Sequence, residues 1–316
     1  MGRTRRAGAP SAEGAVGFFD SGLGGLCILE AFKKLCPGES TVYIADSANC
    51  PYGNRPAEEI VRLSRQNAER LLGLGCKMVV VACNTATAAA IDVLRAEHPE
   101  IPFIGIEPAV KPAALRSKTG VVGVLATAGT FDGRLYKETK AKFAKDVTVI
   151  ATVADEFVEI VESSRVGLGS SRVELGSSRG DYNQTLIDPE LTLTDPKLLP
   201  VVRAKIEPLL NAGCDKIVLG CTHFPHLKPV IEKVCAGRAE VIDPSDAVAR
   251  QAKRVLARLG LSAAPGTSSP THSFIRTRAV QGHTQPSHAE SLVRRWLGGL
   301  CGRSVACRCG RAGSRR

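Results

Sequence analysis

The stretch VVVACNTATAAAI, residues 79–91, leads from an apolar run through a cysteine into a helical segment. Consecutive valines suit a strand that is covered on both faces, and the alanine-rich residues after Cys83 favour a helix. The stretch IVLGCTHFPHLKPVI, residues 217–231, repeats the plan around Cys221: apolar run, small residue, cysteine, small polar residues, helix. The chain is therefore predicted to contain two similar halves, each with one thiol where a strand ends.

Short apolar runs alternate with longer amphipathic stretches along the chain. The runs predicted to form strands are VGFF (16–19), TVYIA (41–45), KMVVVA (77–82), PFIGI (102–106), GVVGVLA (120–126), VTVIAT (147–152), KIVLG (216–220) and EVI (240–242). Runs that are apolar throughout are typical of parallel sheets with helices on both faces. The predicted fold class is α/β, with two similar doubly wound domains, each with a mainly parallel sheet, related by pseudo-twofold symmetry.

Domain boundaries follow from this repeat. A first α/β domain is expected from residues 15–106 plus about 225–300, and a second from residues 107–224. The basic ends of the chain, residues 1–14 and 301–316, are expected to be disordered extensions.

Two further segments interrupt the regular alternation. Ser-Ser-Arg begins at positions 163, 170 and 177, and the low-complexity segment 163–195 is predicted to be a flexible surface insertion. Residues 262–285 are rich in Ser, Thr, Pro and Gly and are expected to form a loose connection to a last helix, residues 287–300.

The basic character of the chain lies at its ends. The formal net charge is +11, but residues 262–316 carry nine arginines against one glutamate, and residues 1–14 carry three against one. The remainder is close to neutral, so the charge indicates solvated tails and nucleic-acid binding is not expected. No apolar run approaches the roughly 18 residues that a membrane span needs, so no membrane association is expected.

The eleven cysteines of the chain are predicted to be free thiols. The first residues, MGRTRRAGAPSAEG, lack the apolar core of a secretion signal, which favours a cytoplasmic, reducing compartment. Cys301, Cys307 and Cys309 cluster in the basic tail without a histidine or a paired C-x-x-C unit, so no metal site is predicted there.

Cys83 and Cys221 are the candidates for chemistry. A thiol at a helix start meets unpaired backbone N–H groups and the positive end of the helix dipole, which is expected to lower its pKa and make it a usable base. The alternative is two buried structural cysteines, because cysteine is among the most buried residue types. Two cysteines in matching contexts, one of them followed by His223, favour the chemical interpretation.

The stretch FFDSGLGG, residues 18–25, resembles a phosphate-binding loop only superficially, since its glycines do not fit the spacing G-x-G-x-x-G. Asp20 and Ser21 end the first predicted strand and are expected to reach the same crevice as Cys83, because ligands of such sheets bind beyond the carboxyl ends of the strands. A simple helix N-cap is the competing interpretation of Asp20.

In ADSANCPYGNRP, residues 45–56, Pro51 and Gly53 predict a turn that holds Tyr52 and the backbone of Gly53 over the crevice. With this turn, four motifs are in place: FDSGLGG, PYGNR, ACNTA and GCTH. In this order and at these intervals they resemble the glutamate racemases of the cofactor-independent aspartate/glutamate racemase family. The resemblance covers about residues 16–260 apart from the insertion.

The resemblance implies interconversion of L- and D-glutamate without a cofactor, supplying D-glutamate for peptidoglycan, by an isomerase whose relatives are often homodimers. It implies that Cys83 and Cys221 transfer protons at opposite faces of the substrate Cα, assisted by Asp20 and His223 respectively. Glu162 matches an accessory acid. The positions that match the family's substrate-binding residues are Asp20, Ser21, Tyr52, Gly53, Asn84, Thr85, Thr222 and His223.

Two alternatives stay open at this point. One is a racemase of another small amino acid such as aspartate, since the pocket size cannot be deduced from sequence. The other is a protein of a different class, either an amino-acid-binding protein without turnover or a redox thiol protein. The presence of both thiols, Asp20 and His223 speaks against the first, and the absence of a C-x-x-C unit at Cys83 and Cys221 speaks against the second.

Overall fold

The computed structural model describes residues 10–166, 198–264 and 269–277. All eight predicted strands form, and a ninth joins them. Their bounds are β1 (Val16–Asp20), β2 (Thr41–Ala45), β3 (Met78–Val81), β4 (Phe103–Gly105), β5 (Val121–Ala126), β6 (Thr148–Val153), β7 (Lys216–Leu219), β8 (Glu240–Ile242) and β9 (His272–Arg276). Every pairing is parallel.

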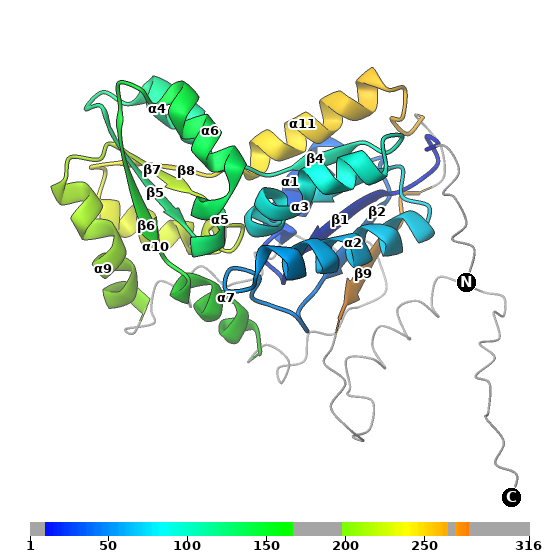
Figure 1. The fold of residues 1–316 in the computed structure, drawn as a ribbon, viewed down its shortest axis with the longest axis horizontal. Helices are drawn as coiled ribbons and strands as arrows, with labels where there is room; N and C mark the ends of the chain where they lie inside the picture. The colour runs from blue at the N-terminus through cyan, green and yellow to red at the C-terminus, as the bar shows by residue number, and fades with distance from the viewer. Residues whose placement is uncertain (1–9, 167–197, 265–268, 278–316) are drawn as a thin grey trace, which may run out of the picture. The chain divides into compact units, whose positions relative to one another are not determined.

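The strands form two sheets with the same internal order. The first sheet runs β4-β3-β1-β2-β9 and the second runs β6-β5-β7-β8. Within each, the first strand in sequence lies between the second and the third, and the fourth lies beyond the third. The predicted class, α/β with two parallel-sheet regions, is confirmed, and we call the layers built on these sheets the first and the second region (Figure 1).

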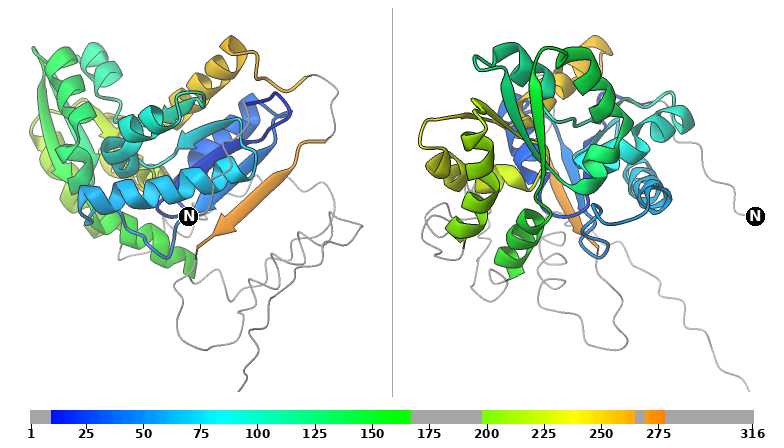
Figure 2. Two further views of the ribbon diagram at one scale, coloured as in Figure 1. Left: turned by 45° about the vertical axis from the view of Figure 1, so that its right-hand side comes forward. Right: turned by 60° about the vertical axis from the view of Figure 1, so that its left-hand side comes forward.

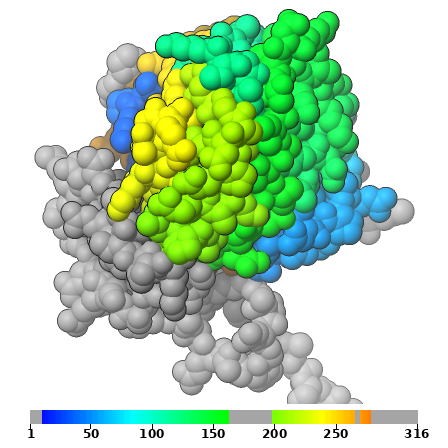
Figure 3. Space-filling view, turned by 90° about the vertical axis from the view of Figure 1, so that its left-hand side faces the viewer, coloured from blue at the N-terminus to red at the C-terminus, as the bar shows by residue number. Residues whose placement is uncertain are grey.

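Helices cover both faces of each sheet. They are α1 (Leu26–Leu35), α2 (Ala57–Gly73), α3 (Asn84–Glu97), α4 (Val110–Arg116), α5 (Ala128–Asp132), α6 (Arg134–Phe143), α7 (Glu156–Val166), α9 (Leu198–Asn211), the short 3-10 helix η2 (Phe224–Leu227), α10 (Lys228–Cys235) and α11 (Ser245–Arg258). In the first region α1 and α11 pack on one face and α2 and α3 on the other. In the second region α4 and α6 pack on one face of the sheet and α7, α9 and α10 pack on the other. Helices α9 and α10 are seen on the surface of this region in Figure 3, in lime and yellow.

Strand β3 shows why the strands are apolar throughout. Met78 and Val80 pack toward α1 and α11, whereas Val79 and Val81 pack toward α2 and α3. All four are completely buried, because successive side chains of a strand point to opposite faces and both faces carry helices.

The second region extends further along the chain than residue 224, where the sequence placed its end. Strand β8 pairs with β7, and α10 packs on α9, so the chain returns to the first sheet only with α11, which packs on α1. A strand of three residues carries too little pattern to reveal which sheet it extends.

Residues 262–285 are not simply a loose connection, since β9 lies within them. It pairs with β2 at the edge of the first sheet, and the ring of Phe274 stacks on that of Tyr43 with centroids 5.5 Å apart (Figure 2, orange strand). Four of its five side chains are half-buried and only Phe274 and Ile275 are apolar, which is typical of an edge strand and gave no clear apolar run.

Helix α7 continues to Val166 and so includes the first residues of the predicted insertion at 163–195. The rest of that segment, the predicted helix at 287–300, residues 1–9 of the basic N-terminal end and the whole basic tail at 301–316 lie outside the described residues. Within the described part of the chain, no helix is both long and apolar enough to cross a membrane.

Candidate active site

The carboxyl ends of β1 and β3 in the first region meet the carboxyl end of β7 in the second. The Thr222 hydroxyl lies 3.4 Å from the Asp20 carboxylate, and the backbone N–H of Leu23 donates to Glu162 at 2.8 Å. The carboxyl ends of parallel strands are where α/β folds place their ligands. Both regions therefore contribute to one site.

Cys83 lies two residues after the end of β3 and caps α3. Its sulfur accepts a hydrogen bond from the backbone N–H of Ala86 at 3.4 Å, and it lies 3.8 Å from the hydroxyl of Ser21. The side chain is 5% exposed. The helix start predicted from the sequence is thus present, with the thiol in the capping position.

Asp20 holds the turn after β1 together. Its carboxylate accepts from the backbone N–H groups of Ser21 at 2.7 Å and Gly25 at 2.6 Å, and it is completely buried. Burial raises the pKa of this carboxyl, partly opposed by the positive charge that His223 can carry. Asp20 is not the N-cap of α1, which is Gly25 without a side-chain cap. The two oxygens of Asp20 hold the turn before that helix, and its carboxyl group also interacts with Cys83.

Cys221 has different neighbours from those of Cys83. Its sulfur lies 3.7 Å from Nδ1 of His223, whose Nε2 is 2.8 Å from a carboxylate oxygen of Glu162. Cys221 and His223 are both buried. An imidazole between a thiol and a carboxylate is an arrangement in which a proton can be held and oriented.

The pKa values of both thiols differ from the expectation. Burial, followed by the negative charge of Asp20, raises the pKa of Cys83 to about 12. Burial likewise raises the pKa of Cys221 well above its usual value, with Cys83 and Asp20 adding to the rise. The helix-start N–H bond to Cys83 acts in the expected direction but is outweighed by desolvation of the thiolate. Without a nearby cation, both groups are thiols at neutral pH.

Tyr52 and Gly53 lie beside this site. Tyr52 is buried in the cluster that contains Cys83, but its hydroxyl donates to Asp46 at 2.6 Å rather than pointing toward the thiol. A Cβ on Gly53 would lie 3.2 Å from the side chain of Thr127, so the backbone of this turn packs against the second region. The Tyr52 hydroxyl is thus occupied by Asp46, and a role of this turn in substrate binding stays a prediction.

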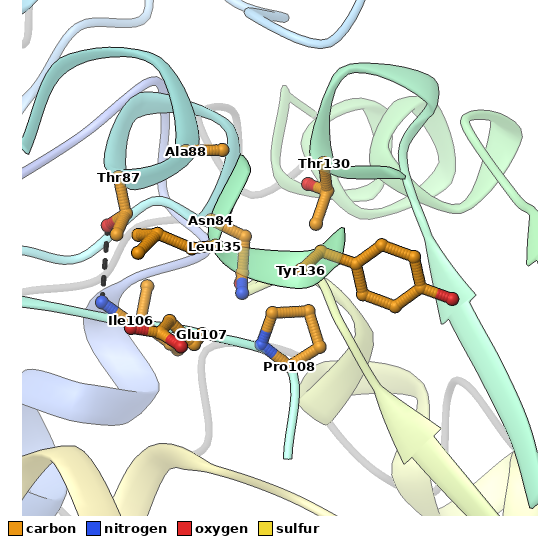
Figure 4. Close-up of a pocket in the computed structure, with 9 residues that line it drawn as sticks. All are labelled: Asn84, Thr87, Ala88, Ile106, Glu107, Pro108, Thr130, Leu135 and Tyr136. Atoms are coloured by element: carbon orange, nitrogen blue, oxygen red, sulfur yellow. Dashed lines mark hydrogen bonds between the residues drawn. The ribbon is translucent and has the colours of Figure 1, made fainter. Parts of the chain in front are cut away.

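Asn84 and Thr85 open helix α3 and face the second region. Asn84 is 3% exposed, and among the described residues neither its amide nitrogen nor its amide oxygen has a hydrogen-bond partner. Figure 4 shows its side chain pointing toward Pro108 in a small cavity between the two regions. A buried amide without a partner is costly unless a ligand or a water completes it.

Thr127 was not among the predicted site residues. Its hydroxyl lies 2.9 Å from that of Thr85 and 3.0 Å from that of Thr130, so three buried hydroxyls join α3 to the start of α5. Thr127 follows β5, the counterpart of β1, in the stretch VLATAGT. Its equivalence to the turn after β1 is the signal that could have identified it.

Comparison with known proteins fits this geometry. The model of the Asp/Glu/Hydantoin racemase family matches residues 27–148 and 136–252. The chain belongs to this family. The family resemblance and the racemase class predicted from the four motifs are thereby confirmed.

Curated relatives are similar over most of their length. Glutamate racemase of Ectopseudomonas mendocina is 40% identical over 245 residues, covering 78% of this chain and 83% of the relative. Glutamate racemase of Herpetosiphon aurantiacus is 41% identical over 246 residues, covering 78% and 86%.

Solved structures are similar in fold. A glutamate racemase of Bacillus anthracis superposes with a TM-score of 0.68 at 28% identity, covering 95% of this chain and 98% of the other. Escherichia coli glutamate racemase, solved with L-glutamate and the activator UDP-MurNAc-Ala, superposes with a TM-score of 0.66 at 26% identity, covering 90% and 95%.

Proposed function

We propose that this protein is a glutamate racemase that inverts the substrate Cα with two thiols and no cofactor. The observation that carries the proposal is the convergence of Cys83 and Cys221, one from each region, on a single buried site. Each thiol lies where the third strand of its sheet ends, and the two are close enough for the charge of Cys83 to raise the pKa of Cys221. Inversion needs one proton donor and one acceptor on opposite faces of one carbon, which two facing strand ends can provide.

In the proposed reaction the substrate's own charge activates the thiols. The carboxyl groups of Asp20 and Glu162 can hold the α-ammonium of an amino acid, which brings a positive charge into the site. A cation beside Cys83 or Cys221 lowers the thiol pKa and opposes the effect of burial. One sulfur then removes the Cα proton as thiolate, and the other delivers its proton to the opposite face.

The neighbouring groups have separate roles in this proposal. Asp20 and Ser21 handle the proton at Cys83, and His223, oriented by Glu162, handles it at Cys221. The carbanion has no electron sink, so its charge must be stabilised by preorganised donors. Asn84, Thr85 and Thr222 supply buried amide and hydroxyl groups for the carboxylates. Because all of these side chains except Glu162 are buried, we infer that the two regions separate for substrate to enter.

Incubation with L-glutamate in D2O tests the proposal. Optical rotation should decay to zero while deuterium enters Cα, and early in the reaction the deuterium should be found in the D-enantiomer only. That early asymmetry follows from two bases, because the group that donates to the product has exchanged with solvent. If the optical rotation does not fall and no deuterium enters Cα, the racemase proposal is wrong and the amino-acid-binding protein without turnover remains. Faster exchange with L-aspartate would favour the alternative substrate.

The proposed role in the cell is supply of D-glutamate for peptidoglycan by a cytoplasmic enzyme. It is supported by the similarity to curated glutamate racemases over most of the chain. The homodimer suggested by the resemblance stays a prediction, which light scattering on the purified full chain would test.

A further inference from the structure

Three side chains that can bind a metal ion converge beside Cys221. They are Cys50 from the turn after β2, Glu162 from α7 and His223 after β7, and one donor atom of each lies within 4.8 Å of the other two. His223 is buried and the other two are partly exposed. The donors therefore come from three segments and both regions, in a place that solvent ions can reach.

We propose that Cys50, Glu162 and His223 form a binding site for Zn²⁺, and that its occupation inhibits the enzyme. Thiolate, carboxylate and imidazole are the ligands that zinc takes in proteins, at about 2.0–2.3 Å. Tetrahedral geometry at these lengths places ligand atoms roughly 3.3–3.8 Å apart, so movements of about an ångström bring all three donors to bonding distance. Three protein ligands leave the fourth position for water.

The surroundings of Cys50 have the charge that such a site needs. Two carboxyl groups, those of Glu162 and Asp20, act on its thiol. Carboxylates beside the donor atoms attract a cation. Zinc binding releases the Cys50 proton to solvent, and the resulting thiolate and the Glu162 carboxylate neutralise the two charges of the ion.

Packing around Gly22 holds two of the donors close together. A Cβ at this position would lie 2.2 Å from the Glu162 carboxylate and 3.1 Å from the Cys50 sulfur, so both side chains rest directly on the glycine backbone. The backbone N–H of Leu23 fixes the same Glu162 oxygen at 2.8 Å. Two of the three donors are thus held in place without a metal, which reduces the entropy lost on binding.

Inhibition follows from what His223 does in the proposed function, on which this part of the inference rests. Nε2 of His223 lies against Glu162 while Nδ1 faces Cys221. A zinc ion bonded to this imidazole prevents it from gaining a proton. Cys221 then loses its proton-handling neighbour. Zinc binding itself does not depend on racemase activity.

The test is a Co²⁺ titration of the full chain with Cys301, Cys307 and Cys309 replaced by serine, so that the tail thiols cannot bind the metal. Cobalt bound to a thiolate gives a sulfur-to-metal charge-transfer band in the near ultraviolet, and zinc should displace it. In this background Cys50→Ser is compared with Cys36→Ser. Like Cys50, Cys36 is partly exposed, but it lies at the C-terminal end of α1 and is not one of the three proposed ligands. Cys50→Ala is a second variant, and circular dichroism checks that each folds.

We expect the band in the parent and in Cys36→Ser and its loss in both Cys50 variants. Zinc affinity, measured by competition with a chelating dye, should fall at least about tenfold, since even loss of an outer-shell partner costs roughly 10–100-fold. No band in the parent, or equal affinity in Cys50→Ser, would overturn the site. If the band behaves as expected but zinc leaves racemisation unchanged, the inhibitory part is wrong. If no racemisation occurs at all, the proposed function fails while the metal site stands.

Discussion

The two regions repeat one scaffold but surround their thiols differently. In each, the cysteine follows the third strand of a sheet whose first four strands have the same order. Cys83 then caps a full helix, α3, whereas Cys221 is followed by the short 3-10 helix η2, with Pro225 near its start, before α10 begins. The first thiol therefore has a helix-start N–H and a carboxyl neighbour, and the second has an imidazole.

The fold places the two sulfurs, whereas single residues that differ between the regions supply their proton-handling partners. Strand order alone places a sulfur at each strand end. The proton-handling partners do not repeat, since Asp20 ends β1 and His223 lies two residues after its own cysteine. A symmetric scaffold thus carries an asymmetric pair of bases, and the predictions below test that asymmetry.

The largest expected effect is that of removing either sulfur. Cys83→Ser and Cys221→Ser should each lower kcat for racemisation by about 10²–10⁴-fold, the usual contribution of a positioned proton-transfer group. A serine hydroxyl keeps the shape of the thiol but is a far weaker acid. Polarimetry with both enantiomers measures the loss, and Cys36→Ser is the matched control outside the site. Normal turnover in either site variant would refute the two-base proposal.

A smaller effect on the rate of racemisation is expected from a substitution at Gly24, whose backbone contacts His223. A Cβ on Gly24 would lie 2.6 Å from Nδ1 of His223 and 2.8 Å from its backbone nitrogen, so Gly24→Ala must displace His223. A displacement of about 1 Å at a catalytic group costs on the order of 10²-fold in rate. Gly38→Ala is the control, since a Cβ there has no described heavy atom within 4 Å. Steady-state kinetics of both variants should separate them, and equal rates would show that His223 tolerates movement.

Most of the strands and the positions of the two thiols could be predicted from the sequence, because they depend on patterns of neighbouring residues. Strands β1 to β8 are short apolar runs, and Cys83 and Cys221 occur in repeated contexts. Strand β9 was missed because its residues pair at a sheet edge and are only half-buried. Thr127 was missed because its partner, Thr85, is distant in sequence. The direction of the thiol pKa was wrong because desolvation depends on how tightly the two regions close, which no local pattern reports.

The Cys83 thiol is expected to lower the free energy of unfolding by about 2 kcal/mol at alkaline pH. Its pKa is about 12 in the folded chain against 9.0 for an ordinary thiol, so above pH 9 the unfolded chain binds fewer protons than the folded one. Raising the pH therefore favours unfolding, by about 1.4 kcal/mol per pH unit between these pKa values, or about 2 kcal/mol at pH 10.5.

Urea denaturation from pH 8.5 to 10.5 measures this contribution as a difference between variants. Cys83→Ser should show a shallower fall in the free energy of unfolding than the parent, because serine does not titrate in this range. Cys36→Ser should fall nearly as steeply as the parent, since its thiol is less deeply buried. Parallel curves for Cys83→Ser and the parent would mean that Cys83 is not desolvated as described.

The smallest expected effect concerns the partners of the two thiols. Asp20→Asn and His223→Gln should each slow racemisation by less than about 10²-fold, because they assist the proton-transfer group without replacing it. The enantiomers have equal free energy, so kcat/KM must stay equal in the two directions and cannot reveal which base has been weakened.

The kinetic isotope effect on kcat can reveal which of the two bases has been weakened. With substrate deuterated at Cα, weakening the partner of one thiol makes proton removal by that thiol more rate-limiting. Asp20→Asn should therefore enlarge the isotope effect for one enantiomer and His223→Gln for the other, whereas the same enantiomer responding to both would place the two residues on one base.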